Sequence, residues 1–225
     1  MNPAWFSTGI YTVRDAARLT GVSAGRIRRW LRGYHYKAGA TQRAQPPLWN
    51  GQWQPIEGSL ALGFQDLIEI RFVDAFLKQG VSWTAIHRAR ERAAQFFKVS
   101  HPFCSNRFVT DGRQFFIEME SSAEQPSLIE IGNPQQVFTQ IMKPFLKELE
   151  FQDGRGVIRW WPLGDERAVV LDPGRNFGRP ISSPHGVPTE VLASAVRTSK
   201  SNDEVARWFN VSVGEIKDSV EFETR

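Results

Sequence analysis

Two short helical patterns separated by a three-residue turn lie near the start of the chain, and they constrain its fold more than any other feature. The apolar side of the first pattern is formed by Val13, Ala16, Ala17 and Leu19. Thr20-Gly21-Val22 predicts the turn, and Ser23 is a favourable N-cap for a second helix. The buried face of that second helix is formed by Ile27, Trp30 and Leu31, spaced i, i+3 and i+4. Residues 13–33 therefore predict a helix-turn-helix.

Positive charge is concentrated around these helices. Residues 1–50 hold eight basic side chains and one acidic side chain, a net +7, so the other 175 residues sum to −3 within the chain's net +4. An excess of positive charge at one end predicts a polyanionic partner. The same count would fit a solvated basic surface, so the position of the charges on the motif has to decide between the two.

Helical geometry predicts which arginines face outward. A rotation of about 100° per residue puts Gly25, Arg29 and Arg32 opposite the buried Ile27 and puts Arg26 and Arg28 on the flanks. Arginine can read guanine through two hydrogen bonds in the major groove, and flanking arginines suit the phosphates. Glycine inside a helix costs roughly 1 kcal/mol relative to alanine, so close approach of the DNA backbone would explain Gly25. The alternative is an ordinary surface helical hairpin with solvated arginines.

The helix-turn-helix is therefore expected to bind double-stranded DNA. The candidate DNA-binding residues are Arg14, Ser23, Gly25, Arg26, Arg28, Arg29, Arg32, Lys37 and Arg43. Because one short helix reads few base pairs, a homodimer that doubles the site is expected as well.

The rest of the chain predicts a mainly α-helical α+β fold with small β elements. Helices are expected at residues 64–79, 82–98, 134–149, 188–198, 203–209 and 212–222, with Pro144 kinking or breaking the third. Hairpins are expected at 47–53, around Asn50-Gly51, and at 107–119, around Asp111-Gly112. A strand is expected at 128–131, and residues 157–161 are expected to pair with 168–171. Trp49 and Trp53 are expected to be exposed.

Changes of unit are indicated by a Gly-rich turn at 153–156 and by a stretch that contains Pro and Gly at 172–188. We expect a DNA-binding domain at 1–99, a central β/α linking or dimerisation region at 100–163, and a C-terminal helical domain at 164–225. The last two helices, joined by Asn210-Val211-Ser212, form a second helix-turn-helix-like pattern. The central residues expected to supply dimerisation or a partner contact are Phe115, Phe116, Ile117, Ile129 and Ile131.

The run from Tyr11 to Gly33 resembles the DNA-binding head of MerR-type regulators. The residues that match that family's recognition-helix pattern are Ser23, Ile27, Arg28 and Trp30. The similarity covers residues 11–95 through Asp66-Leu67, Ile70, Val73, Gly80, Val81-Ser82 and Ile86. It implies a winged helix-turn-helix, with a wing at 37–63 that is longer than usual and with Arg29 and Leu31 in place of the usual aromatic and acidic residues. No heptad pattern predicts the dimerising coiled coil that usually ends MerR proteins.

The C-terminal sequence resembles a small, formally uncharacterised domain best known in bacterial VapB-like antitoxins. The matching residues are Leu171-Asp172-Pro173, Phe177-Gly178-Arg179-Pro180, Gly186-Val187-Pro188-Thr189, Glu204-Val205-Ala206, Val213, Glu215 and Ile216. Many members carry a Thr-Arg pair where this chain has His185-Gly186, so any role of that arginine does not carry over. The resemblance implies an antitoxin of a type II toxin–antitoxin system, which represses its own promoter and neutralises a PIN-like ribonuclease toxin.

Charge favours a protein partner for this end of the chain. Residues 187–225 hold five basic and seven acidic side chains, a net −2, whereas a second DNA-reading element should be basic. A purely structural helical cap is the alternative for this domain. For the whole chain, one alternative is a MerR-like transcription factor that senses a small ligand within residues 100–160. The other is an interaction subunit whose basic end binds an acidic protein.

Motifs that would indicate an enzyme are missing from the sequence. It contains no P-loop, no dinucleotide-binding glycine fingerprint, no nucleophile elbow and no zinc-protease motif, so we expect neither catalysis nor a cofactor. His101 and Cys104 have a ligand-like spacing, but a zinc site needs about four ligands, and no metal is expected. A single cysteine, no signal-peptide pattern and no apolar run of ~18 residues predict a cytoplasmic protein that does not enter a membrane.

Overall fold

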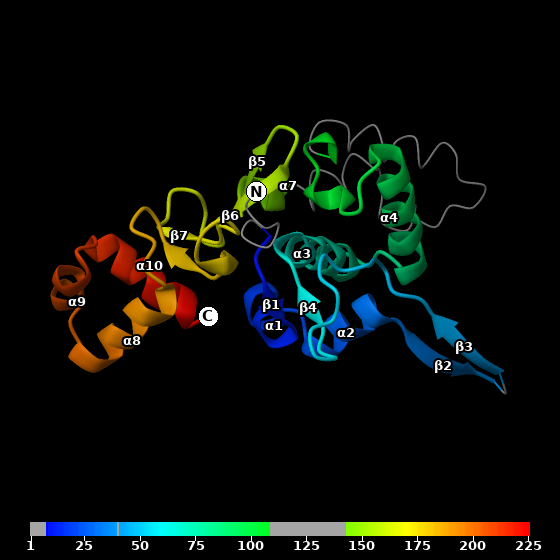
Figure 1. Ribbon diagram of the computed structural model, residues 1–225, viewed down its shortest axis with the longest axis horizontal. Coiled ribbons are helices and arrows are strands. Elements are labelled where there is room, and N and C mark those ends of the chain that lie inside the picture. The colour runs from blue at the N-terminus through cyan, green and yellow to red at the C-terminus, as the bar shows by residue number, and fades with distance from the viewer. Residues whose placement is uncertain (1–7, 40, 109–142) are drawn as a thin grey trace. The chain divides into compact units, whose positions relative to one another are not determined.

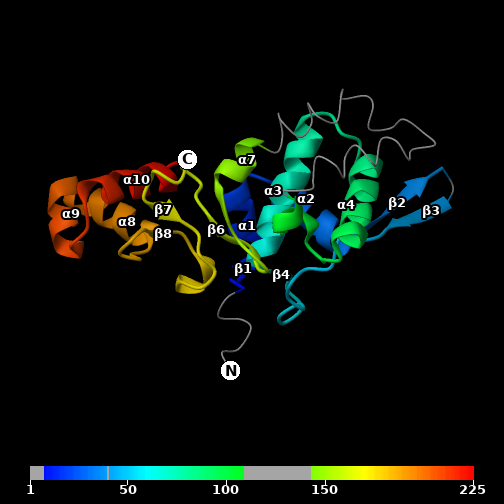
Figure 2. The same ribbon diagram turned by 90° about the horizontal axis from the view of Figure 1, so that it is seen from above.

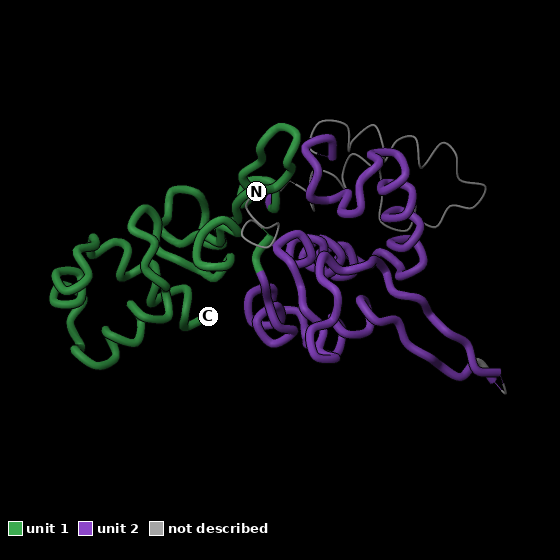
Figure 3. Tube along the Cα trace, viewed as in Figure 1, with its two compact units in different colours: residues 1–9, 145–225 green, residues 10–144 purple. Residues whose placement is uncertain are grey.

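The structure, a computed structural model of residues 1–225, describes residues 8–39, 41–108 and 143–225 (Figure 1). The chain forms two compact units, one of Met1–Gly9 with Phe145–Arg225 and one of Ile10–Pro144 (Figure 3). Helices make up most of the regular structure in the described residues, and the strands there form two-stranded antiparallel sheets. The expected α+β class is confirmed, while the three domains expected from the sequence remain a prediction.

The first helix of the predicted pair, α1 (Val13–Thr20), is closed at both ends by local sequence signals. At its start Thr12 Oγ1 accepts from the Asp15 amide (3.1 Å), and the Asp15 carboxylate accepts from the Thr12 amide (3.0 Å). At its end Gly21 has φ 73°, a left-handed conformation that glycine adopts without strain. These caps stop the helix after eight residues and turn the chain into the next one.

The second helix, α2 (Ala24–Arg32), begins after Ser23, which is its N-cap as predicted. Its buried residues are Ile27, Trp30 and Leu31, as their spacing predicts. A short ladder between β1 (Tyr11–Thr12) and β4 (Ala61–Leu62) ties the start of this helix pair to the chain that leads into α3 (Phe64–Lys78). The arginine-bearing helix is thus mounted on a larger helical core.

That core is formed by α3 and α4 (Trp83–Phe97), both of which the helical period predicts. Ser82, at the start of the helix predicted at 82–98, caps α4 by accepting from the Ala85 amide (3.2 Å). The rings of Phe72, Phe103 and Phe108 lie with centroids 5.6, 6.1 and 5.0 Å apart. Aromatic packing of this kind buries a large apolar area and fixes α3 against the segment that follows α4.

A β-hairpin follows α2, and it extends away from the helices of its unit in both views (Figures 1 and 2). β2 (Tyr34–Ala38) and β3 (Thr41–Gln45) pair antiparallel, with Tyr34 opposite Gln45. Every described side chain of the two strands is exposed or half-buried. Because an isolated two-stranded hairpin is marginally stable, this one depends on contacts at its base.

The hairpin predicted around Asn50-Gly51 is wrong. Those residues lie in an irregular segment between β3 and β4, and Trp49, expected to be exposed, is only 4% exposed. The indole N–H of Trp49 donates to the buried Asp66 carboxylate (2.8 Å). The local turn preference of Asn-Gly is therefore outweighed by burial of the indole beside an acceptor on α3. Trp53 is half-buried.

Asp66 on α3 is a buried acceptor for the irregular segments around it. It accepts hydrogen bonds from the Trp49 indole (2.8 Å) and from the backbone amides of Gln52 (3.0 Å) and Gly63 (2.8 Å). Nε2 of His101 lies 2.9 Å from the same carboxylate. Asp66 therefore fixes both the segment that leads into α3 and the segment that follows α4.

Glu69, one turn further along α3, holds Arg90 of α4. Its carboxylate accepts from Arg90 Nε (3.2 Å) and from the Phe103 amide (3.0 Å). The other guanidinium nitrogens of Arg90 donate to the carbonyls of Leu48 (3.3 Å) and Ser100. Burial raises the pKa of Glu69, and the positive charge of Arg90 acts in the opposite direction. The pair is accordingly a buried ion pair whose remaining donors are used by backbone carbonyls.

Several predicted elements lie wholly or partly outside the described residues. The strand at 128–131 and the apolar residues at 115–117, 129 and 131 are among them. The hairpin predicted at 107–119 is described at its first two residues only, and these are helical. The helix predicted at 134–149 is described from residue 143, and it is wrong at its end, because α7 (Lys143–Lys147) stops before a strand that begins at Leu149. Pro144 lies within the described part of this helix.

Strand pairing in the unit that contains residues 145–225 differs from the prediction. β5 (Leu149–Gln152) pairs with β6 (Gly156–Trp160), and β7 (Val169–Val170) pairs with β8 (Ile181–Ser182). The predicted pairing of 157–161 with 168–171 is reduced to one bridge between Trp160 and Leu171. The tight turn after β5 places β5 beside β6, so β6 pairs with this neighbour and not with residues 168–171.

Three helices end the chain as predicted: α8 (Thr189–Ser199), α9 (Asn202–Phe209) and α10 (Val213–Glu223). They enclose a buried cluster of Leu192, Val205, Ala206, Val211 and Ile216. Asn210 ends α9 in the left-handed conformation at φ 52°, and Ser212 caps α10. No helix in the described ranges is both long and apolar enough to cross a membrane.

Glu215 joins α10 to β8 of the same unit. It accepts from the Ser212 amide (2.9 Å) in a capping box and from Ser182 Oγ (2.9 Å), and His185 Nδ1 lies 2.9 Å from it. Burial raises the pKa of Glu215, but these hydrogen bonds together outweigh burial and lower it from its ordinary value of 4.5. A short chain of polar contacts therefore fixes where the last helix begins.

We predict that Asp66→Ala strongly destabilises the unit that contains α3. The variant leaves the Trp49 indole and two backbone amides without their buried acceptor, and breaking a buried charged contact of this kind costs about 3–5 kcal/mol. Urea unfolding followed by tryptophan fluorescence measures the change. Asp165→Ala, which removes an exposed loop carboxylate, is the matched control and should differ from the wild type by less than about 0.5 kcal/mol. Equal stability of both variants would contradict the role given to Asp66.

We also predict that Glu215 makes an acid-sensitive contribution to the stability of the C-terminal helices. Because its pKa is lower in the folded chain than in the unfolded chain, this contribution is complete above pH 4.5 and is lost as the pH falls through the folded value. Glu215→Gln should therefore weaken α10 at neutral pH and reduce the further loss on acidification. Urea titrations followed by NMR signals of α10, at about pH 7, 5 and 3, test this. An unchanged pH dependence in Glu215→Gln would show that Glu215 makes no acid-sensitive contribution to stability.

Candidate nucleic-acid interface

The outer side of α2 carries three exposed arginines, opposite its buried apolar face. Arg28 makes no hydrogen bond or ion pair with any residue in the described part of the chain. The Arg29 guanidinium lies over the Tyr34 ring, 4.2 Å from its centroid, and Arg32 Nη2 donates to the Gly58 carbonyl (2.9 Å). Arg28 is thus available to a partner, while neighbouring groups orient Arg29 and Arg32 at the surface.

Arg26 is exposed, but its guanidinium contacts other residues of the same unit. Its Nη1 lies 3.0 Å from Asp74 Oδ1 on α3, and its guanidinium lies 5.3 Å from the centroid of the Trp30 ring. Asp74 is nearly buried, and it also pairs with Lys78 at 2.8 Å. This contact could not be predicted from the helical pattern of α2, because Asp74 lies 48 residues further along the chain. In the structure Arg26 anchors α2 to α3, which sequence reasoning did not predict.

Ser23 and Gly25 lie at the exposed start of α2. The Ser23 hydroxyl accepts from the Arg26 amide (3.4 Å), so in the free protein it serves as the helix cap. A Cβ atom added at Gly25 would meet nothing within 4 Å, and no left-handed φ is recorded there. Neither packing nor backbone conformation in the described residues requires glycine at this position. The surface over Gly25 is therefore open to a molecule that approaches α2.

The remaining candidate residues lie on two further elements of the same unit. Arg14 is exposed in the first turn of α1, and Lys37 and Arg43 are exposed on the two strands of the hairpin. Across the hairpin, Lys37 is opposite Gln42 and Tyr36 is opposite Arg43. No acidic residue occurs between residues 34 and 45. The unit thus presents basic side chains on α1, on α2 and on an acid-free hairpin.

The hairpin also carries aromatic residues, which were not among the candidate site residues predicted from the sequence. The rings of Tyr34 and Tyr36 lie with centroids 5.9 Å apart, and Tyr36 is 40% exposed. His35, between them in sequence, is also exposed. The alternation Tyr-His-Tyr-Lys at 34–37 has the period of two that is typical of a strand, and this signal could have predicted β2.

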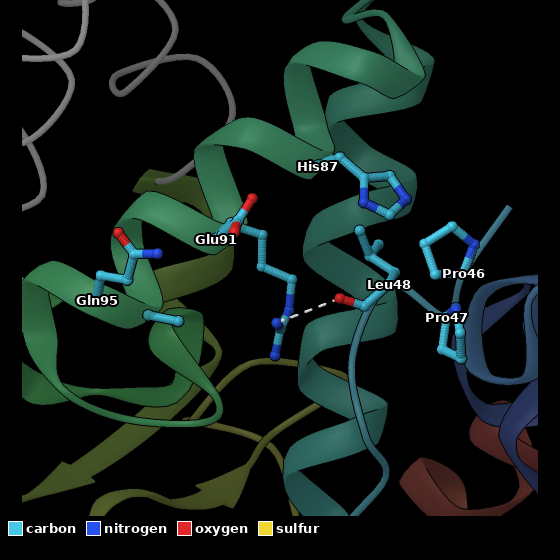
Figure 4. Close-up of a pocket in the computed structure, with 8 residues that line it drawn as sticks. Pro46, Pro47, Leu48, His87, Glu91 and Gln95 are labelled. Atoms are coloured by element: carbon cyan, nitrogen blue, oxygen red, sulfur yellow. Dashed lines mark hydrogen bonds between the residues drawn. The ribbon is translucent and has the colours of Figure 1, made fainter.

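A solvent-open groove of about 480 Å³ lies between the segment after the hairpin and α4 (Figure 4). Its lining residues are Pro46, Pro47, Leu48, His87, Arg90, Glu91, Ala94 and Gln95. Arg90 reaches across to the Leu48 carbonyl, as the dashed line in Figure 4 shows. Burial lowers the pKa of His87, and the charge of Arg90 lowers it further. The imidazole of His87 in the groove is therefore harder to protonate than an ordinary histidine side chain.

His101 and Cys104, whose spacing is ligand-like, are both buried in the core. His101 bonds to Asp66 (2.9 Å), and the Cys104 thiol donates to the Gln65 carbonyl (3.4 Å). Burial raises the pKa of this thiol well above its ordinary range. Among the described residues, no group of three or more His, Cys, Asp and Glu side chains could hold a metal ion.

The chemistry of this surface is suited to a phosphate backbone with base edges beside it. Arginine and lysine form charge-assisted hydrogen bonds with phosphates, and their binding releases counterions from the nucleic acid. An α-helix fits the major groove of B-form DNA, and a two-stranded ribbon can contact the backbone beside it. The exposed arginines of α2 and the basic hairpin therefore form a candidate nucleic-acid interface.

Comparison with solved structures places the chain in a known fold. The crystal structure of Rv2018 from Mycobacterium tuberculosis matches with a TM-score of 0.70 and 21% sequence identity, over 93% of this chain and 96% of that chain. In sequence, the chain is similar to "Putative antitoxin VapB45" from Mycobacterium tuberculosis, with 24% identity over 227 residues, 96% of this chain and 94% of that protein. No protein-family model matches the chain. Homology along nearly the whole chain supports the resemblance to VapB-like antitoxins.

Proposed function

We propose that this chain is an antitoxin-type transcriptional autorepressor, which binds its own operator and neutralises a PIN-like ribonuclease toxin. The observation that carries the proposal is the similarity to VapB45 over 96% of the chain. The exposed arginines of α2 and the basic hairpin support DNA binding as one half of the function. The acidic C-terminal helices support a protein partner as the other half.

In this proposal α2 is the recognition helix of a MerR-like winged helix-turn-helix. Base edges in the major groove are assigned to Arg29 and to Arg28, because Arg28 has no partner among the described residues, although its flanking position on the helical wheel predicts a phosphate contact. Arg14 and Arg32 contact phosphates, and Lys37 and Arg43 bring the hairpin to the neighbouring backbone. Gly25 lets the DNA backbone approach the start of the helix. A homodimer reads two half-sites, because one helix of nine residues reaches too few base pairs.

The toxin contact is proposed for the unit that contains α9. Trp208, in the last turn of this helix, is 59% exposed, although the neighbouring Val205 and Ala206 are buried. Tryptophan is enriched among the residues that contribute most to protein interfaces. A ribonuclease must hold a polyanion with basic groups, and the net −2 of residues 187–225 is complementary to such a surface. Trp208 is therefore proposed as an anchor of the toxin interface.

A ligand-sensing transcription factor is the second candidate function. The groove beside α4 favours it, because its volume of about 480 Å³ can accept a small molecule near the hairpin. Purification of the chain from cells that express it from its native operon separates the two candidates. A stoichiometric complex supports the antitoxin, whereas no complex together with ligand-dependent promoter binding supports the sensor.

We predict that Arg28→Ala combined with Arg29→Ala abolishes specific binding to the chain's own promoter. Loss of two base contacts should weaken the affinity on the order of a hundredfold and make binding less sensitive to salt. Fluorescence anisotropy with promoter DNA over a series of salt concentrations measures both. Arg88→Ala combined with Arg92→Ala removes the same charge from exposed positions on α4 and is the matched control. Equal losses in both double variants would mean that α2 does not read the operator.

We predict that Trp208→Ala weakens toxin binding by about thirtyfold, as expected for an interface anchor, and leaves promoter binding unchanged. Titration calorimetry with a catalytically inactive form of the toxin measures the affinity. Ile56→Ala, which removes a 48% exposed apolar side chain from the other unit, serves as the control. Full toxin affinity in Trp208→Ala would place the interface elsewhere.

A further inference from the structure

The hairpin that carries Lys37 and Arg43 needs a support, because its own strands bury very little. At its start Gly33 has φ 69°, and a Cβ atom there would lie 2.3 Å from the Gln45 carbonyl oxygen. Only glycine can occupy this position, since both the conformation and the close approach exclude a side chain. The last residue of β3 is thus pressed against the end of α2.

The side chain of Gln45 makes a second contact, with α4. Its Nε2 lies 3.2 Å from Nε2 of His87. An amide nitrogen is a donor, so the imidazole nitrogen has to accept, and the ring has to be neutral with its proton on Nδ1. The lowered pKa of His87, caused by burial and then by Arg90, is consistent with a neutral ring. Glu91, which also lines the groove, acts in the opposite direction.

The His87 ring is also connected to the recognition helix through aromatic contacts. It meets Trp83 edge-on, with 4.9 Å between ring centroids, and Trp83 stacks on Trp30 of α2 at 6.0 Å and 24°. The Trp30 carbonyl in turn accepts from the Leu48 amide (2.7 Å), in the segment that leaves the hairpin. The base of the hairpin and α2 are therefore held by the same pair of rings on α4.

We propose that His87 is a positioning residue, which holds the hairpin at a fixed place relative to α2 through Gln45 on one side and Trp83 on the other. This inference rests on the proposed DNA-binding function. When two elements contact one DNA site, a fixed geometry lets the second contact form without a further loss of freedom. Specific binding needs both contacts together, whereas non-specific binding needs only the positive charge. His87 therefore contributes to the preference for the operator and not to the general affinity for DNA.

The test compares His87→Ala with His87→Gln and Gln95→Ala in the full-length chain. Gln95 lines the same groove and no hydrogen bond of its side chain occurs among the described residues, which makes it the matched control. The readout is the ratio of affinities for the promoter fragment and for a scrambled duplex of the same composition. His87→Ala should lower this ratio about fivefold, as expected for one lost hydrogen bond. His87→Gln, which can still bond to Gln45, should keep most of it.

A double-mutant cycle of Gln45→Ala and His87→Ala tests whether the two side chains act through their contact with each other. If Gln45 and His87 act through each other, the double variant loses no more of the ratio than either single variant. A loss of thermal stability in His87→Ala with an unchanged ratio would overturn the proposal, because a purely structural residue would behave in that way. Additive losses in the cycle would also overturn it.

Amide hydrogen exchange of residues 34–45 without DNA separates this proposal from the proposed function. Faster exchange in His87→Ala than in Gln95→Ala shows that His87 holds the hairpin, even if the wild-type chain does not prefer its promoter. In that case the DNA-binding function fails while the positioning role stands. Equal exchange in the two variants would overturn the positioning role, whatever the DNA measurements give.

Discussion

The unit with the candidate DNA-binding residues depends on Arg90, a guanidinium buried between α3 and α4. Irregular segments carry amides and carbonyls that need partners once they are buried. Arg90 supplies donors to the carbonyls of Leu48 and Ser100, while Glu69 balances its charge. Removing one member of such a pair leaves a buried charge without compensation, which costs far more than the intact pair contributes. The path of the chain out of the hairpin is therefore fixed inside the core.

In this unit, the arginines that hold the candidate interface in place are different from the arginine that is available to a partner. Arg90 is buried with Glu69, and the exposed Arg26 is paired with Asp74. Arg28 is exposed on α2 without such a pair among the described residues. The other unit has the opposite character, with acidic terminal helices whose polar contacts converge on Glu215. A chain built in this way is suited to two partners of opposite charge. The proposed antitoxin function requires such a division of labour.

Features with local signals could be predicted from the sequence. Ser23 and Ser82 each cap the helix that follows them, and the side of α2 that is exposed follows from its apolar spacing. Features that depend on distant residues could not. Arg26 looks like a surface arginine until Asp74 is placed beside it, and Asn50-Gly51 predicts a hairpin until Trp49 finds Asp66. The pairing of β6 with β5 was also not predicted, because the sequence patterns of local and of longer-range strand pairs are similar.

Gly25 has a consequence for how related systems in one cell could be kept apart. Its Cβ direction is empty in the free protein, so a larger residue there would leave the fold intact. Replacing glycine by alanine inside a helix stabilises it by roughly 1 kcal/mol. A change at this position would therefore alter the surface proposed to face DNA without a cost in folding. In the proposed function Gly25 faces the DNA backbone, which carries no sequence information, so a larger residue there would hinder DNA binding as a whole. A duplicated copy of the chain could thus leave its operator through a single substitution and keep its fold.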